Sequence, residues 1–382
     1  MNLPLAVGLI LFALFFAAFV GIKLLRMPDI VIYIIAGAGL SLTGYFGDTE
    51  VFTIAGEIGL IVLFFLLGMK FTFGELTSKG KKVWKASLLD AVFGIGVTFA
   101  ICMIAGYEFF TSFLIAGLVY ATSSSITVKL LEHKNKLDRK ESGFILSLLI
   151  FEDLITPLLI TVLIGLSGDG LTVMDFVFIF LKIALLVAGS ILFSKVVFKR
   201  AHGLITRFLD EDYFVLFVLG VAITYGGFAL YLDLSEVIGA FLAGIMMAET
   251  QFKEKVKEVV MPVRNLFLPF FFLNFGLSLE FTKEIPAFGL LFIILIWSVL
   301  SKLIVGYLGG QWYGLSKRES FESGLVLTPR GEFSVIVAGL ATGVIQIFAG
   351  MYILIAALLG MFLVQLSPKI SDKIMGKSKE EK

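Results

Sequence analysis

The sequence predicts an all-α polytopic membrane protein, and three observations carry this prediction. Hydrophobic residues make up 58% of the 382-residue chain and charged residues only 16%, compared with about 25% charged in a typical soluble domain. Apolar stretches long enough to cross a hydrocarbon core of about 30 Å recur from one end of the chain to the other. These stretches are continuously apolar rather than alternating, which excludes a transmembrane β-barrel.

Thirteen transmembrane spans are predicted, each an apolar stretch bounded by short polar turns. They cover about residues 4–24, 28–46, 54–71, 86–107, 111–131, 141–165, 175–198, 212–231, 234–249, 258–279, 286–310, 320–342 and 345–367. The basic residues support this count, because Lys and Arg collect in cytoplasmic loops. Every second loop, from the one after the first span onward, together with the C-terminal tail holds 27 of the 31 basic residues. We therefore expect the N-terminus outside the cell and the C-terminus in the cytoplasm.

Short sequence matches indicate that the chain contains two related halves. Ala36–Gly37, Phe64–Leu66 and Gly117–Val119 each recur 207 residues later. Six spans followed by one connector would insert the second half with the opposite orientation, which is the inverted repeat common in transporters. The predicted boundaries are 1–167 for the first repeat (spans 1–6), 168–207 for the connector (span 7), 208–370 for the second repeat (spans 8–13) and 371–382 for a cytoplasmic tail.

Other classes of function lack support in the sequence. The net charge is +1 and no block of basic residues is present, which argues against nucleic-acid binding. Cys102 is the only cysteine and His133 and His202 are the only histidines, so neither an intrachain disulfide nor a His/Cys metal site can form. The sequence contains no glycine-rich phosphate loop and no hydrolase triad in the membrane. We therefore expect a protein that is not an enzyme and has no cofactor.

Two adjacent acids in the middle of the sixth span, Glu152 and Asp153, mark the strongest candidate site. An ionisable residue at the bilayer centre costs at least about 2.5 kcal/mol on insertion scales, so it is a functional candidate by default. A carboxylate there can hold a dehydrated cation or a proton, and the two compete for it. The alternative is a structural pair neutralised by Lys302 or Arg330.

Helix-interrupting residues occur at equivalent positions of the two halves. In the fifth span they are Thr122, Ser123, Ser124 and Ser125, whose hydroxyls compete with the helical backbone for hydrogen bonds. In the twelfth span, Pro329 removes a backbone donor and Gly331 weakens the helix. A symmetric pair of interrupted helices indicates a midplane transport site that offers hydroxyls and carbonyls to a cation. The alternative is that the small residues serve helix packing.

Three further charges inside spans are predicted to compensate the acids. Lys302 lies about ten residues, or some 15 Å, from either end of the eleventh span, which is far for snorkelling to the surface. We expect it to pair with Asp153 when that residue binds neither a cation nor a proton. Arg330 and Glu332 either form a fixed ion pair within the interrupted twelfth span or take part directly in transport.

Two functions are compatible with these features. The first is a secondary active antiporter that exchanges a cytoplasmic cation for an external proton by alternating access. The second is a gated cation channel or efflux pore that uses the same acidic site. The inverted repeat and the interrupted helices favour the antiporter, because a channel needs no alternating rigid body.

Five motifs occur along nearly the whole chain in an order that is typical of one transporter family. They are Ala121–Ser125, Phe151–Asp153, Gly239–Gly244, Phe271–Gly276 and Arg330–Phe333. Together they resemble the monovalent cation:proton antiporter-2 family, and most of all its KefC- and KhtU-like bacterial potassium/proton antiporters.

This resemblance implies a thirteen-helix sodium/proton antiporter fold with two crossed broken helices, a homodimer in lipid of the bacterial inner membrane. It implies that K+ or Na+ binds at Asp153 in exchange for H+ and that Lys302 pairs with this aspartate. Many potassium-specific relatives have Gln where this chain has Glu152. We expect only Asp153 to release its proton in each cycle, which makes exchange electroneutral. KefC-like chains continue into a cytoplasmic regulatory domain, whereas this sequence ends at Lys382, so regulation is expected from a separate subunit.

Overall fold

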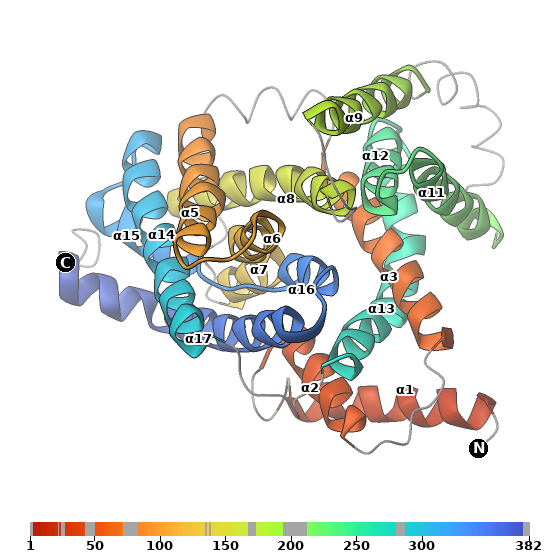
Figure 1. Cartoon of the computed structure of the whole chain (residues 1–382), viewed down its shortest axis with the longest axis horizontal. Helices are drawn as coiled ribbons and strands as arrows, with labels where there is room; N and C mark the ends of the chain where they lie inside the picture. The colour runs from red at the N-terminus through yellow and green to blue at the C-terminus, as the bar shows by residue number, and fades with distance from the viewer. Residues whose placement is uncertain are drawn as a thin grey trace. The chain divides into compact units, whose positions relative to one another are not determined.

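The computed structural model describes residues 3–21, 23, 27–42, 50–71, 83–133, 136, 139–166, 173–193, 212–279 and 287–376. All regular structure within these ranges is helical (Figure 1). The helices are α1 (Leu3–Val20), α2 (Asp29–Ser41), α3 (Glu50–Gly68), η2 (Val92–Val97), α5 (Thr98–Ile104), α6 (Phe109–Tyr120), α7 (Ser124–His133), α8 (Lys140–Leu166), α9 (Val173–Phe193), α11 (Phe214–Tyr231), α12 (Glu236–Ala248), α13 (Lys253–Leu277), α14 (Phe288–Tyr313), α15 (Lys317–Val326), α16 (Glu332–Gly339) and α17 (Gly343–Met375).

Seven helices in the described part of the chain are long and apolar enough to cross a membrane. They are Val51–Gly68, Val83–Ile104, Lys140–Leu166, Phe214–Tyr231, Lys253–Leu277, Phe288–Tyr313 and Gly343–Met375. The helix Val83–Ile104 contains the π-helical turn η2 and ends as α5. The chain is therefore an all-helical polytopic membrane protein. Five shorter apolar helices accompany these seven, and the count of thirteen spans stays a prediction.

The chain forms two compact units, and each is assembled from separate stretches of sequence. The first unit comprises residues 1–46, 79–156 and 275–382, and the second comprises 47–78 and 157–274. Both interrupted segments, the acids Glu152 and Asp153, and Lys302 belong to the first unit. The candidate site can therefore be described within one unit.

In the second unit, α12 packs closely against two neighbours through glycines. A Cβ atom at Gly68 of α3 would overlap the carbonyl of Phe241, and one at Gly244 would overlap the carbonyl of Phe65. Gly239 approaches the Tyr225 carbonyl of α11 in the same way. Small residues that let backbones approach are a common basis of helix association in lipid, where no hydrophobic force drives helices together.

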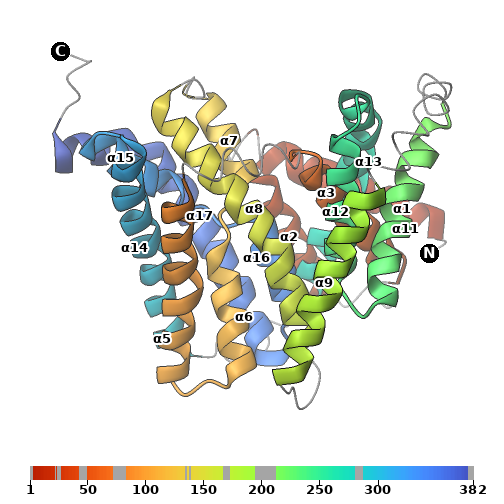
Figure 2. The ribbon, with the colours of Figure 1, turned by 90° about the horizontal axis from the view of Figure 1, so that it is seen from above.

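In the first unit, α14 lies along the helix that ends as α5 (Figures 1 and 2). It also packs on α15, because Gly306 and Gly324 bring the two backbones into direct contact. Buried apolar side chains from six helices fill the interior beside this contact, among them Phe144, Leu148 and Val305. This packing fixes the helices that carry the candidate site.

Helix boundaries in the two halves of the chain follow the offset seen in the sequence. The helix α2 begins at Asp29 and α12 begins at Glu236, 207 residues later. The helices α6 and α7 are separated by residues 121–123, and α15 and α16 are separated by residues 327–331, which lie at the same offset. These coincidences favour the predicted repeat.

Two of the predicted boundaries fall on segments that the structure describes only in part. The connector, predicted over 168–207, contains α9 (Val173–Phe193), and its remaining residues lie outside the described ranges. The predicted tail over 371–382 begins as helix, because α17 continues through Pro368 to Met375. Residues 377–382 lie outside the described ranges.

Substitution of Gly360 in α17 can test how tightly the chain packs around the interruption between α15 and α16. A Cβ at this position would lie 2.6 Å from the backbone nitrogen of Pro329. We expect Gly360→Ala to lower the free energy of unfolding by about 1–3 kcal/mol, the usual cost of overpacking. Gly289→Ala is the matched control, because nothing lies within 4 Å of the added methyl. Thermal melting of the purified variants measures the difference, and equal melting temperatures would contradict the packing.

Candidate functional site

The two predicted helix interruptions are present in the structure. The backbone leaves the helix after Tyr120 and re-enters it at Ser124, and Ala121 is extended. It leaves the helix again after Val326 and re-enters at Glu332, with Gly331 extended. Each interruption ends one half-helix and begins another, so carbonyls and N–H groups lose their regular helical partners at both places.

The interrupted segments bond directly to each other. The Ser123 N–H donates to the Pro329 carbonyl at 2.8 Å, and the Thr122 hydroxyl lies 3.0 Å from the Leu327 carbonyl. The Ser123 hydroxyl donates to Glu332 Oε2 at 3.0 Å. A side chain at Gly331 could not fit, because its Cβ would lie 2.6 Å from Ser123 Cβ. The two segments thus supply some of each other's missing backbone partners.

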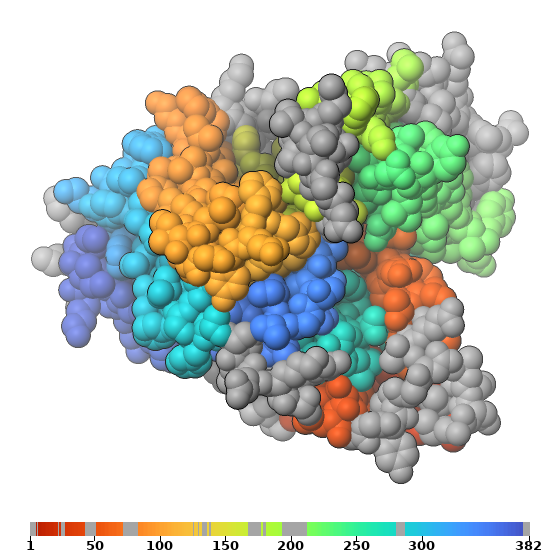
Figure 3. All heavy atoms as spheres, viewed as in Figure 1, coloured from red at the N-terminus to blue at the C-terminus, as the bar shows by residue number. Residues whose placement is uncertain are grey.

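Neighbouring helices hold this crossing in place. Ser334 of α16 donates its hydroxyl hydrogen to the Leu118 carbonyl of α6 at 2.8 Å. The helices α6 and α14 form a continuous surface in the space-filling view (Figure 3).

Thr122, Ser123 and Ser124 are all buried. The side chain of Ser125, also predicted at the site, lies outside the described residues, as do the side chain of His133 and all of His202.

Glu152 is bound to the first interruption. Its Oε2 accepts the Thr122 N–H at 2.5 Å, and its Oε1 lies 3.2 Å from the Thr122 hydroxyl. Asp153 is the next residue of α8 and is equally buried. Pro157 follows four residues later and has no N–H to donate to the Asp153 carbonyl, so the regular helical hydrogen bond cannot form there.

Lys302 lies at the centre of the charged groups, with an exposed fraction of 0%. Its ammonium donates to Asp90 Oδ1 at 2.7 Å and to Glu152 Oε1 at 3.1 Å. The ring of Tyr120 lies 5.6 Å from the same nitrogen, within range of a cation–π interaction. The sequence predicted Asp153 as the partner of Lys302, whereas the ion pairs of this lysine run to Asp90 and Glu152. Adjacent residues of a helix point about 100° apart, and here Glu152 is the one turned toward α14.

Asp90 is a member of the buried charged group that the sequence prediction missed. It is completely buried in the helix Val83–Ile104 and belongs to the same first unit as Lys302. The signal was present, because an acid within the predicted span 86–107 is costly in lipid.

Arg330 and Glu332 act on the ends of the half-helices. The Arg330 guanidinium donates to the carbonyls of Leu327, Thr328 and Ser298 at 3.2–3.3 Å. A cation at these carbonyls stabilises the negative end of α15, and Glu332 in the first turn of α16 stabilises the positive end of that helix. The two residues therefore compensate helix dipoles, and their predicted roles as a fixed ion pair or in transport stay predictions.

Polar contacts stabilise the N-terminus of α15. Ser316 and Glu319 form a reciprocal capping box, in which Glu319 Oε2 accepts the Ser316 N–H at 2.7 Å. Burial raises the pKa of Glu319, but the Ser316 hydrogen bonds and the nearby cations Lys140 and Arg318 outweigh it, so this pKa lies below its ordinary value. Glu322, one turn further on, is buried and binds both Lys136 and Arg318.

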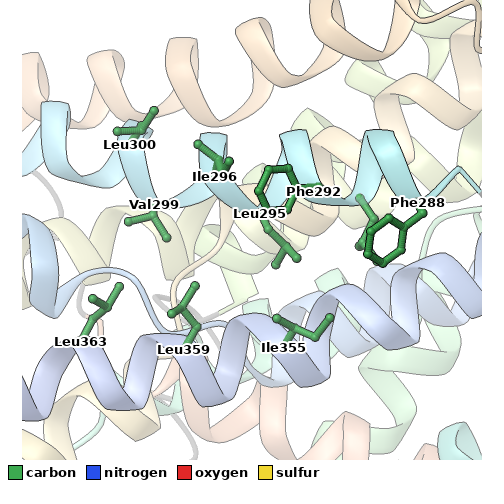
Figure 4. Close-up of a pocket in the computed structure, with 10 residues that line it drawn as sticks. Phe288, Phe292, Leu295, Ile296, Val299, Leu300, Ile355, Leu359 and Leu363 are labelled. Atoms are coloured by element: carbon green, nitrogen blue, oxygen red, sulfur yellow. The ribbon is translucent and has the colours of Figure 1, made fainter.

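A pocket in the first unit lies away from these charges. It has a volume of about 520 Å³, lies between α14 and α17, and is lined by apolar side chains such as Phe292, Ile296 and Leu359 (Figure 4). None of its lining residues belongs to the charged group. Among the described residues, no three His, Cys, Asp or Glu side chains are grouped to hold a tightly bound metal ion.

The family of this chain follows from its similarity to known proteins. The family of transmembrane sodium/hydrogen exchangers matches residues 10–368, nearly the whole chain. The chain belongs to the sodium/hydrogen exchanger family. This is a family of transporters rather than enzymes, and membership supports cation/proton antiport as the function.

Individual relatives agree with this assignment. A protein of Alkalihalophilus pseudofirmus, the ammonium/H+ antiporter subunit AmhT, is 47% identical over 97% of this chain and 94% of its own length. The K+/H+ antiporter subunit KhtU of Bacillus subtilis is 29% identical over 85% of this chain and 81% of its own length. The Na+/H+ antiporter NhaS3 of Synechocystis is 25% identical over 87% of this chain and 74% of its own length.

The fold matches a solved antiporter. The sodium proton antiporter MjNhaP1 of Methanocaldococcus jannaschii aligns with a TM-score of 0.73 over 99% of this chain and 100% of that one, at 19% identity. The predicted antiporter fold is confirmed by this likeness. The sequence prediction was also right that the chain is a multi-pass cation/proton antiporter.

Lys302 provides a direct test of the charged group. Lys302→Met would leave the ionised Glu152 buried without its cation, and we expect a loss of about 3–5 kcal/mol in unfolding free energy. Lys182→Met is the control, because Lys182 pairs with the exposed Asp233 and such surface pairs contribute about 0–1 kcal/mol. Denaturation of purified protein measures both. Unchanged stability of Lys302→Met would show that the ammonium does not neutralise the cluster.

Proposed function

We propose that this protein is a secondary active antiporter that exchanges a cytoplasmic monovalent cation for external H+ by alternating access, with Asp153 as the shared site. The observation that carries this proposal is the meeting of two interrupted helices beside the buried acids of α8. Thr122 joins the three parts, because it bonds to Glu152 and approaches the Leu327 carbonyl.

The chemistry of this crossing suits a cation that has lost its water. Carbonyl groups at the end of α6 and the hydroxyls of Thr122, Ser123 and Ser124 are hard oxygen ligands. The Asp153 carboxylate adds the negative charge, and protonation cancels that charge. A cation and a proton therefore compete for one group, which is the requirement for coupled exchange.

The architecture proposed for transport is the thirteen-span inverted repeat with the N-terminus outside. It is supported by helix boundaries that recur after 207 residues and by interruptions at matching positions. A homodimer in the bacterial inner membrane is proposed with it. Two relatives are named as antiporter subunits, which supports a separate regulatory subunit for this chain as well.

The proposed cation is K+ or NH4+, two monovalent ions of similar size. The sequence prediction was K+, with Na+ as the other candidate. The relative that is 47% identical is an ammonium/H+ antiporter subunit, and a more distant one is a K+/H+ antiporter subunit. The similarity to the K+/H+ antiporter subunit also supports a place for this chain in the monovalent cation:proton antiporter-2 family. Exchange measured in turn with NH4+, K+, Rb+, Na+ and Li+ ranks the candidates.

Asp153→Asn is the central test of the site. We expect it to abolish exchange while the protein stays folded, because the amide can neither release a proton nor balance a cation. Asp233→Asn, at an exposed position, is the control and should exchange normally. The measurement is cation-driven proton movement in proteoliposomes. Full exchange by folded Asp153→Asn would remove the site assignment, and a diffusion potential without proton coupling would favour the channel.

The pH dependence should show competition at this site. In acid, each fall of one pH unit should raise the cation concentration needed for half-maximal exchange by about tenfold, because one proton competes with one cation. High cation concentration should restore the rate. A rate that falls in acid at every cation concentration would indicate loss of folding or a separate inhibitory proton.

Glu152 is expected to hold the crossing together without carrying a transported proton. Its two carboxylate oxygens are bound by the Thr122 N–H and the Lys302 ammonium, so both are engaged in contacts that hold the crossing. Exchange should then be electroneutral, with a rate that does not respond to an imposed membrane potential. A potential-dependent rate in the wild type that disappears in Glu152→Gln would make Glu152 a second proton carrier.

A further inference from the structure

Acids outnumber bases in the described part of the buried charged group around the site. It contains four acids and two bases: Asp90, Glu152, Asp153, Glu332, Lys302 and Arg330. All six are buried in the first unit. With every one ionised, these six groups alone would sum to two excess negative charges, and isolated charge in a low-dielectric interior is strongly disfavoured.

Two of the acids share one cation. The Lys302 ammonium contacts Asp90 Oδ1 at 2.7 Å and Glu152 Oε1 at 3.1 Å. Both carboxylates have exposed fractions of 1% or less. One ammonium cannot neutralise two buried carboxylates, and two acids that share a site rarely both ionise.

The hydrogen bonds distinguish these two acids. Both oxygens of Glu152 face obligate donors, the backbone N–H of Thr122 and the ammonium of Lys302. Only one oxygen of Asp90 has such a donor, since Asp90 Oδ2 is buried and has no hydrogen-bond partner among the described residues. A bare carboxylate oxygen in that position costs more than a neutral hydroxyl does.

We propose that Asp90 is a proton-binding site, and that its Oδ2 holds a resident proton that stays in place during exchange. The groups that act on it are Lys302 from α14, Glu152 from α8, Tyr120 from α6 and Arg330 from the segment before α16. With Asp90 neutral, a single excess negative charge remains in the cluster.

This resident proton explains how one-for-one exchange could leave the cluster neutral. One proton or one monovalent cation at Asp153 then gives these six groups the same net charge in either state. The inference rests on the proposed exchange at Asp153. It adds that Asp90, on a helix outside the two interruptions, helps to determine the net charge that an exchanged ion meets at the site.

The experiment compares Asp90→Asn with Glu152→Gln, two neutral replacements of nearly equal shape. Asparagine mimics protonated Asp90, so Asp90→Asn should melt and exchange like the wild type. Glu152→Gln removes a charge that Lys302 needs and should melt at a lower temperature. Infrared spectra recorded at neutral pH with saturating K+ should contain a protonated-carboxyl band that shifts in D2O, disappears in Asp90→Asn and remains in the exposed-site control Asp233→Asn.

Each opposite result overturns the proposal. A wild-type spectrum without such a band, or an Asp90→Asn spectrum that retains it, would show that Asp90 is ionised. Loss of exchange in folded Asp90→Asn would give the carboxylate itself a role in transport. A membrane-potential dependence of the rate that disappears in Asp90→Asn would show that this proton is transported rather than resident. Exchange that survives in Asp153→Asn would instead refute the proposed function and leave the Asp90 band unaffected.

Discussion

The structure of the first unit depends on the need to satisfy every backbone polar group inside the membrane. A helix that breaks in lipid exposes N–H and carbonyl groups that water cannot reach. Here two broken helices supply partners to each other, through the Ser123 N–H and the Pro329 carbonyl. Close approach requires Gly331 on one side and Ser123 on the other. Neither interruption would be stable alone, so the site exists only where they cross.

The charges follow from the same constraint. Each half-helix end carries a partial charge, and Arg330 and Glu332 oppose the ends of α15 and α16 that they adjoin. Glu152 binds a backbone N–H freed by the first interruption, and Lys302 then neutralises Glu152. We propose that exchange takes place at the neighbouring acid, Asp153, beside these fixed charges.

The sequence predicted those features that depend on local chemistry. Pro329, Gly331 and the run of hydroxyl residues from Thr122 disrupt a helix wherever it lies, so both interruptions could be located in advance. The partner of Lys302 could not, because the choice between Glu152 and Asp153 depends on how α8 is rotated. Asp90 was missed for a related reason, since only packing of its helix against α14 brings it to the lysine.

The central claim is that a cation and a proton compete for Asp153, and proton release on binding tests it most directly. Calorimetric titration of purified protein with K+ or NH4+, in buffers of different ionisation enthalpy, counts the protons released for each cation bound. The account predicts close to one proton per cation under conditions in which Asp153 starts protonated, and none in Asp153→Asn. Cation binding without proton release in the wild type, or equal release in Asp153→Asn, would contradict it.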